Sequence, residues 1–255
     1  MANDATDDVT DDASGSRLIA HLIELRSRLL RAIVGLLVLL LALLPFANRL
    51  YAWLAQPLLA KLPAGGQLIA TEVASPFFAP LKLVFCVALV ASMPWLLYQL
   101  WAFVAPGLYK REKRLALPLL ASALALFYAG CAFAYFIVLP AVFAFLHRVT
   151  PPGVAMMTDI SAYLDFVLVI FLAFGVSFEL PVALVILVLL GWVTPAQLRE
   201  WRGYAIVGIF VVAAVLTPPD VVSQLLLALP MIALYELGIL AARLLAPKPD
   251  AASRA

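Results

Sequence analysis

Long apolar segments constrain this chain more than any other feature. Uncharged or nearly uncharged stretches recur at about 31–50, 83–107, 115–140, 166–190, 203–217 and 221–242. A helix needs about 20 mostly apolar residues to cross the hydrocarbon core of a bilayer. Of the 255 residues, 65% are hydrophobic and 13% are charged, whereas a soluble domain averages roughly 45–50% apolar and 25% charged residues. No soluble fold of this size hides so much apolar surface, so we expect an all-α membrane protein with six transmembrane helices.

Basic residues are distributed unevenly between the loops that join these spans. If the N-terminus lies in the cytoplasm, the outer segments hold four of the 17 basic residues, which are Arg49, Lys61, Lys82 and Arg148. The inner segments hold all the others. Cytoplasmic loops carry the excess of Lys and Arg in membrane proteins. Because an even number of spans puts both ends on one side, we expect both termini in the cytoplasm.

The two ends of the chain differ from the membrane domain at 17–245. Residues 1–16 contain five Asp and no Lys or Arg, and they lack the apolar residues that folding requires. They are predicted to be a disordered acidic tail. The segment also lacks the basic region of a signal peptide, so the first span is expected to stay uncleaved. Residues 246–255 are predicted to be a flexible tail.

An amphipathic helix is predicted just before the first span. Leu22, Leu25 and Leu29 share one face of it, whereas Glu24 and Arg28 lie on the opposite face. Glu24 either pairs with Arg28 one turn later, which is a structural role, or offers its carboxylate to a cationic ligand. Periodicity alone favours the structural role.

A second acid lies on the same side of the membrane, between the second and third spans. Glu112 is the only acid in the basic cluster Lys110-Arg111-Glu112-Lys113-Arg114. It either pairs locally within that cluster or forms a second carboxylate site. Two carboxylates on one face suit a pair of guanidinium groups, because arginine is planar, always charged and donates two parallel hydrogen bonds to a carboxylate.

Glu179 is unusual because it lies near the middle of the fourth span. A charge there costs about 2.5–3.5 kcal/mol on insertion scales, so this acid needs protein, water, a proton or a polar partner beside it. Pro181 leaves the carbonyl of Ser177 without its helical donor and predicts a bend. A proton relay needs a second titratable group in mid-membrane, and the other spans supply none. We therefore favour a polar docking point for another transmembrane helix.

Alternative functions remain open on these residues alone. A proton-coupled small-solute transporter that uses Glu179 is one alternative, and a structural scaffold for other membrane proteins is another. Asp220 follows two prolines and is predicted to be a helix N-cap. Glu236, near the inner end of the last span, either extends its carboxylate to the membrane surface or pairs with Arg243.

Several kinds of chemistry have no motif in the sequence. It contains no phosphate-binding loop, serine-hydrolase elbow or zinc-protease motif, and its two His residues lie on opposite sides of the membrane. Its two Cys residues lie in apolar stretches without metal or redox spacing. We therefore expect no enzyme, no cofactor, no metal site and no nucleic-acid partner.

A series of longer motifs carries a family resemblance. In chain order they are His21-Leu22-Ile23-Glu24-Leu25-Arg26, Ala74-Ser75-Pro76-Phe77-Phe78, Phe103-Val104-Ala105-Pro106-Gly107-Leu108-Tyr109 running into Glu112, Phe174-Gly175-Val176-Ser177-Phe178-Glu179-Leu180-Pro181 and Leu216-Thr217-Pro218-Pro219-Asp220. Over roughly residues 18–245 the chain resembles the TatC family, the core membrane component of the twin-arginine protein translocase.

This resemblance implies both a shape and a function. It implies a concave, glove-like bundle in the cytoplasmic membrane of a bacterium, in contact with membrane lipid and self-associating. It implies that the chain receives folded precursor proteins whose signal peptides carry paired arginines. Export is then driven by the proton-motive force, together with TatA- and TatB-like single-span proteins.

The resemblance also implies roles for individual residues. The signal-peptide site would contain Glu24, Glu112, Phe103 and Arg26. An intramembrane polar surface that docks partner helices would contain Glu179, Gln224 and Thr217. Further functional candidates are Pro57, Tyr135 and Asp220.

Overall fold

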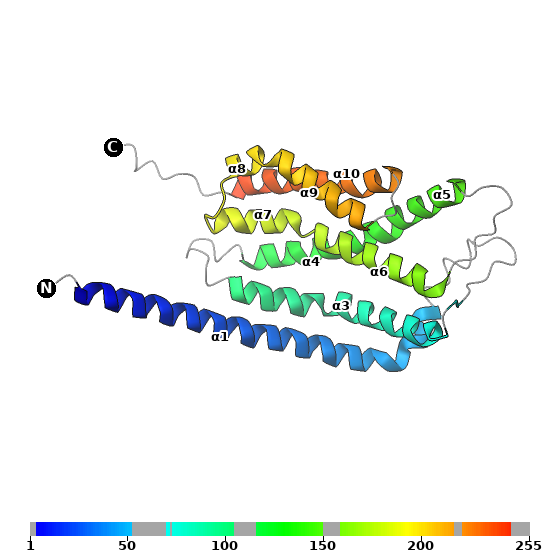
Figure 1. The fold of residues 1–255 in the computed structure, drawn as a ribbon, viewed down its shortest axis with the longest axis horizontal. Helices are drawn as coiled ribbons and strands as arrows, with labels where there is room; N and C mark the ends of the chain where they lie inside the picture. The colour runs from blue at the N-terminus through cyan, green and yellow to red at the C-terminus, as the bar shows by residue number, and fades with distance from the viewer. Residues whose placement is uncertain are drawn as a thin grey trace.

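A computed structural model of the chain describes residues 4–52, 70–71, 73–104, 116–149, 159–216 and 221–245. The elements in these residues are all helical (Figure 1). They are α1 (Asp4–Leu43), η1 (Leu44–Phe46), α3 (Ser75–Val104), α4 (Ala116–Phe133), η4 (Ala134–Val138), α5 (Leu139–Val149), α6 (Ile160–Ser177), α7 (Leu180–Leu189), α8 (Pro195–Glu200), α9 (Arg202–Leu216) and α10 (Val221–Leu245). The prediction of an all-α fold is confirmed.

Most of the predicted spans correspond to long apolar helices. Within the described residues, five segments have the length and composition to cross a membrane: Leu22–Ala52, Ser75–Phe103, Leu117–Phe145, Ile160–Leu189 and Gln224–Leu245. The predicted span at 203–217 corresponds to α9, a shorter apolar helix of 15 residues. The six-span count therefore depends on whether α9 crosses the bilayer.

Helix α1 is longer than the sequence predicted. Its 40 residues join the predicted amphipathic helix to the first span without a break. It also begins at Asp4, so the structure describes residues 4 to 16 of the predicted acidic tail as part of this helix. Pro45, at the start of η1, ends the helix because the residue before a proline disfavours the α conformation.

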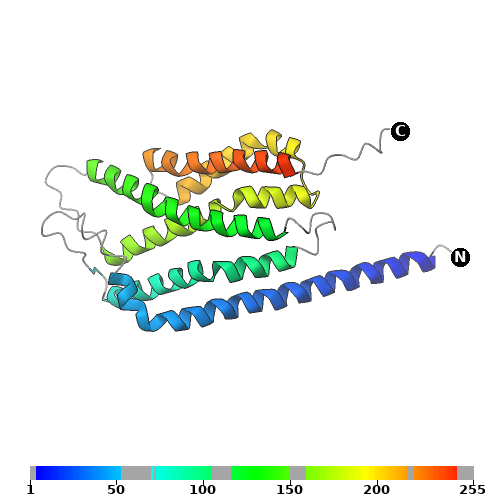
Figure 2. The same ribbon diagram turned by 180° about the vertical axis from the view of Figure 1, so that it is seen from behind.

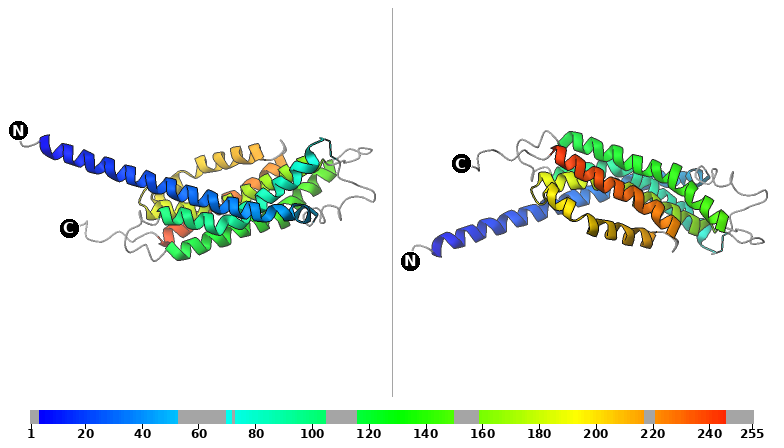
Figure 3. Two further views of the ribbon diagram at one scale, coloured as in Figure 1. Left: turned by 90° about the horizontal axis from the view of Figure 1, so that it is seen from below. Right: turned by 90° about the horizontal axis from the view of Figure 1, so that it is seen from above.

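The helices are arranged in layers between two edges. α1 forms one edge and packs mainly on α3, whereas α8, α9 and α10 form the opposite edge (Figures 1 and 2). Between them, α3 packs on α4 and α6, and α7 packs on α10. Figure 3 shows α1 and α9 on separate sides of the bundle. α1 begins and α10 ends at the same end of the bundle, which we call the inner end, and the opposite one the outer end.

The core holds large apolar side chains packed against small residues. Phe127 of α4 and Phe174, Leu164 and Ile170 of α6 are among the largest fully buried side chains. Gly175 allows Phe127 to approach α6, because a Cβ at residue 175 would lie 2.7 Å from Cε2 of that ring. Close approach at a small residue is a common way to pack helices in a membrane.

Two prolines shape the middle of the bundle. α6 ends at Ser177 and α7 begins at Leu180, just before Pro181, so the predicted bend in the fourth span is confirmed. Pro140 likewise has no N–H for the carbonyl of Phe136. The turns just before it form the π-helix η4, in which the Leu139 N–H bonds to the Ala134 carbonyl, five residues back. The apolar pattern predicted a regular third span and gave no sign of this change.

Candidate functional site

Helices α1 and α3 lie side by side and run in opposite directions. The Trp95 indole N–H donates to the Arg31 carbonyl at 3.0 Å. Gly35 makes room for this ring, because a Cβ there would lie 2.4 Å from Trp95 Nε1. Glu24 lies seven residues before Arg31, and Phe103 lies eight residues after Trp95. At about 1.5 Å per residue both lie roughly 10–12 Å from this contact toward the inner end, and so at a similar level.

Among the described residues, the Glu24 carboxylate is paired through one of its two oxygens. Nε and Nη2 of Arg28 donate to Glu24 Oε1 at 2.9 and 2.7 Å, which confirms the predicted pair. Glu24 Oε2 has no hydrogen-bond partner among the described residues, and the side chain is 38% exposed. Arg26, two residues further on, is also exposed. Within the described residues, Glu24 Oε2 is therefore available to accept from a guanidinium group.

Of the other two predicted members of the signal-peptide site, the structure describes Phe103 and does not describe Glu112. Phe103 is half-buried near the end of α3. Glu112 lies outside the described residues, in the connection 105–115 that follows α3. The fold thus brings Glu24 and Phe103 to one end of the bundle, where that connection begins, and the position of Glu112 remains a prediction.

Glu179 lies at the break between α6 and α7, where its described neighbours leave one carboxylate oxygen without a hydrogen bond. Its backbone N–H donates to the Val176 carbonyl at 3.0 Å. Its Oε1 atom is buried and has no hydrogen-bond partner within the described part of the chain. The nearby Ser177 hydroxyl donates to the Ala173 carbonyl at 2.5 Å instead. A buried acceptor without a partner costs about 1–3 kcal/mol, so this site suits a donor brought by another molecule.

The remaining predicted site residues are spread over the bundle. Gln224 is not free, because its Nε2 donates to the Phe210 carbonyl at 3.1 Å and so links α10 to α9. Tyr135 lies in η4 with its ring centroid 6.1 Å from that of Phe171. Outside the described residues lie Pro57, Thr217 and Asp220.

Polar contacts at the outer end tie α6 to the segment before α3 and were missed by the sequence analysis. Asp159 caps α6 by accepting from the backbone N–H groups of Ser161 and Ala162 at 2.8 and 3.0 Å. Its second oxygen accepts from the hydroxyl and backbone N–H of Thr71 at 2.7 and 2.9 Å. These bonds, led by the one from the Thr71 hydroxyl, hold the pKa of Asp159 well below its usual range. An aspartate before an apolar run is a cap signal that was available, whereas a partner 88 residues away was not.

Two ion pairs also join helices that are distant in sequence. Lys82 of α3 donates to both carboxylate oxygens of Asp165 in α6 at 2.8 Å. At the inner end Arg202 of α9 pairs with Glu236 of α10. The predicted alternative of a Glu236–Arg243 pair is wrong, because Arg243 lies two helical turns further along α10 while Arg202 comes from the neighbouring helix.

Comparisons with known proteins identify the family to which the chain is similar. The sequence model of the family described as Sec-independent protein translocase protein (TatC) matches residues 20–230. The Sec-independent protein translocase protein TatC of Azotobacter chroococcum is 58% identical over 222 residues, which cover 87% of each chain. The protein of the same name from Escherichia coli K12 is 55% identical over 226 residues, which cover 89% of this chain and 88% of its own. A crystal structure of the twin arginine translocase receptor TatC matches with 37% identity and a TM-score of 0.79, over 88% of this chain and 99% of that one.

Proposed function

Because the chain belongs to the TatC family of Sec-independent protein translocase proteins, it is a core membrane subunit of that translocase, and we propose that its inner end receives paired-arginine signal peptides. It is a multi-pass membrane protein that works with other subunits of the translocase. The relatives are translocase proteins, which does not favour the alternative of a small-solute transporter.

One observation carries the proposed signal-peptide site. Within the described residues, Glu24 Oε1 is paired with Arg28 and Oε2 has no partner, and Glu24 lies level with Phe103 at the inner end. The open oxygen accepts from the first guanidinium group of a signal peptide, and the aromatic ring offers an apolar surface to the residues that follow. By the family resemblance, Glu112 accepts from the second guanidinium group. Hydrogen bonds to charged groups contribute about 1.5–3 kcal/mol each.

The orientation in the membrane follows from the distribution of charge. We propose that the inner end faces the cytoplasm of a bacterium, with both termini there, because the connections at that end carry most of the basic residues. We also propose that α9 is the fifth of six spans. Its 15 residues reach about 22 Å, shorter than a hydrocarbon core of about 30 Å, which favours a locally thinned bilayer. Scattering from the protein in lipid discs that shows bulk thickness beside it would contradict the thinning.

The partner helices are proposed to dock near Glu179 and along α9 and α10. The unsatisfied Glu179 Oε1 is an acceptor for a polar side chain of a TatA- or TatB-like single-span protein. α9 also carries exposed apolar side chains, among them Val211 and Val215. Co-purification of a tagged single-span partner tests this: Glu179→Gln should retain the partner and Glu179→Leu should lose it. Equal retention by both variants would contradict a polar contact.

The signal-peptide site is tested by binding at equilibrium. A fluorescent signal peptide with Arg-Arg, and the same peptide with Lys-Lys, are titrated with the purified chain in detergent. We expect Glu24→Gln to weaken the Arg-Arg peptide at least tenfold, since about 1.4 kcal/mol corresponds to a factor of ten. Glu200→Gln, an exposed acid on α8 at the same end, is the matched control and should bind as wild type. Equal affinity for both peptides, unchanged in Glu24→Gln, would contradict the site.

A further inference from the structure

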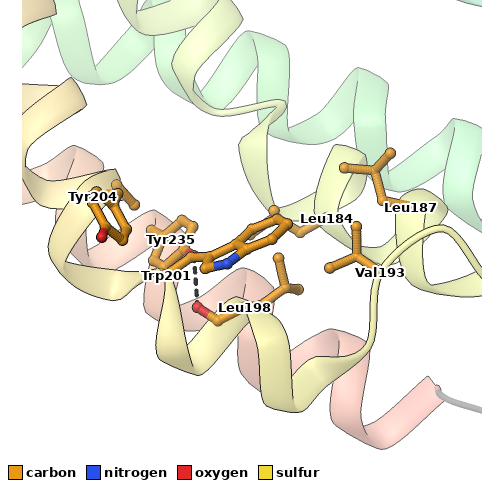
Figure 4. A pocket seen from close by; sticks show the side chains of 8 residues that line it. Leu184, Leu187, Val193, Leu198, Trp201, Tyr204 and Tyr235 are labelled. Carbon is orange, nitrogen blue, oxygen red and sulfur yellow. Dashed lines mark hydrogen bonds between the residues drawn. The ribbon is translucent and has the colours of Figure 1, made fainter.

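An apolar pocket opens at the inner end, on the side of the bundle away from α1. It has a volume of about 520 Å³ and lies between α7, α8, α9 and α10 (Figure 4). Leu184 and Leu187 of α7 form one wall, Leu198 of α8 lies across from them, and Trp201 and Ala205 close it from the start of α9. The signal-peptide proposal does not use this pocket, and the partner-docking proposal names Glu179, Val211 and Val215, which are not among its lining residues.

The walls of the pocket are set by specific local structure. Gly191 has a φ of 72°, a conformation that lets the chain turn sharply after α7 and that other residues adopt with strain. Thr194 then starts α8 with a capping box that it shares with Gln197. The Tyr235 hydroxyl of α10 donates to the Leu198 carbonyl at 2.7 Å, which fastens α8 across the pocket. These contacts fix the position of α8 beside α7 and α10.

The mouth of the pocket has the residues of a membrane–water interface. Tyr204 is 81% exposed, and Trp201 is 48% exposed while its ring lines the pocket. Tyr and Trp are enriched where lipid headgroups meet the hydrocarbon core. Apolar walls below exposed aromatic rings are suited to a chain that enters from the headgroup level.

Basic residues outnumber acidic ones on the described helices α7 to α10, which form the pocket. Arg199, the residue after Leu198, is exposed and makes no ion pair within the described part of the chain. The neighbouring Arg202 is paired with Glu236 and so contributes little net charge. Arg199 and Arg243, the latter in the last turn of α10, exceed the exposed Glu200 of α8 by one charge. An apolar hollow whose lining residue Leu198 is followed by an exposed arginine is complementary to an amphipathic molecule with an anionic head.

We propose that this pocket binds one acyl chain of an anionic phospholipid from the cytoplasmic leaflet, with the lipid phosphate held at Arg199. Basic pockets between transmembrane helices on the cytoplasmic side are a known type of anionic-lipid site. The acyl chain fills the space between α7 and α9 and thereby fixes the short helix α8 and the start of α9.

A thermal-shift titration tests the proposal. The delipidated chain in detergent is mixed with phosphatidylglycerol, with phosphatidylcholine of the same acyl chains, or with inorganic phosphate. We expect phosphatidylglycerol at about 100 times its Kd to raise Tm by roughly 5–10 °C. We expect a much smaller shift from phosphatidylcholine and none from phosphate. Equal shifts from both lipids, or the same shift from phosphate alone, would overturn the proposal.

Matched variants distinguish lipid binding in the pocket from lipid contacts elsewhere on the protein surface. Ala205→Phe fills the pocket and Arg199→Gln removes the phosphate contact, so both should lose most of the phosphatidylglycerol-specific shift. Ala214→Phe, nine residues further along α9 and on its opposite exposed face, and Arg148→Gln at the outer end should keep it. A full shift in Ala205→Phe would overturn the proposal.

A crosslinking measurement in native membranes identifies the occupant without relying on stability. Tyr204→p-benzoylphenylalanine places a photoreactive group at the mouth of the pocket. After irradiation, we expect an adduct with the mass of one phospholipid. An adduct with the mass of a protein would overturn the lipid assignment in favour of a partner helix.

Discussion

Substitution of Gly35 by alanine should loosen α1 from the rest of the bundle. The added methyl group would lie 2.4 Å from Nε1 and 2.5 Å from Cδ1 of Trp95, so the indole ring has to move. Movement breaks the 3.0 Å hydrogen bond from Trp95 to the Arg31 carbonyl and disturbs the stacking of Trp95 on Tyr98. Because α1 packs mainly on α3, no other large contact compensates for this loss.

The magnitude follows from the two effects together. Overpacking costs about 1–3 kcal/mol, and loss of a hydrogen bond costs about 0.5–1.5 kcal/mol. Trp95 is 42% exposed and can turn partly outward, which relieves some of the clash. We therefore expect Gly35→Ala to lower the free energy of unfolding by about 2 kcal/mol. We also expect weaker binding of an Arg-Arg signal peptide, because Glu24 and Phe103 no longer lie level.

Denaturation in detergent, combined with peptide titration, measures both quantities. Gly208→Ala is the matched control, since nothing lies within 4 Å of a Cβ there, and it should not destabilise the protein. Trp95→Ala removes the ring that the methyl group strikes, so in that background Gly35→Ala should cost little. If Gly35→Ala costs as much with Trp95 absent as with Trp95 present, the steric argument is refuted.

Two further predictions concern the bend in the fourth span and the outer end. Pro181→Ala restores an N–H donor for the Ser177 carbonyl, so α6 and α7 should straighten and the distance between spin labels at their far ends should increase; an unchanged distance would mean that packing and not the proline sets the bend. The lowered pKa of folded Asp159 means that its carboxylate stabilises the fold fully above its unfolded pKa and loses this effect as pH falls through the folded value. The stability difference between wild type and Asp159→Ala should therefore be constant from neutral pH to about pH 4 and narrow below it, and a difference that narrows already near pH 6 would contradict the hydrogen bonds from Thr71.

Local features of the chain were predictable because they depend on neighbours in sequence. Apolar length predicted the helices, and Pro181 predicted the break after Ser177. The Glu24–Arg28 pair followed from the spacing of one helical turn. Each of these depends on residues within a few positions of one another.

Contacts between distant segments were not predictable in the same way. Lys82 and Asp165 are 83 residues apart, and the sequence around each residue does not indicate that the two form an ion pair. Glu236 pairs with Arg202 of a neighbouring helix and not with Arg243 of its own. The apolar pocket is also invisible in the sequence, because it depends on how four helices meet. The candidate signal-peptide site was found through family motifs, and the order of the spans already placed Glu24 and Phe103 on one side of the membrane. The contact of Trp95 with the Arg31 carbonyl, which brings α1 against α3, was not predictable.

The central claim is that paired arginines bind at the inner end beside Glu24. The most direct measurement places a photoreactive group next to the two arginines of a folded precursor, irradiates it with the chain in membrane vesicles, and maps the crosslinked residues by mass spectrometry. We expect crosslinks within 17–31 of α1, near Phe103, and in the connection 105–115, all lost when the arginines are replaced by lysines. Crosslinks confined to α9, α10 or the outer end, or crosslinks that persist with lysines, would contradict it.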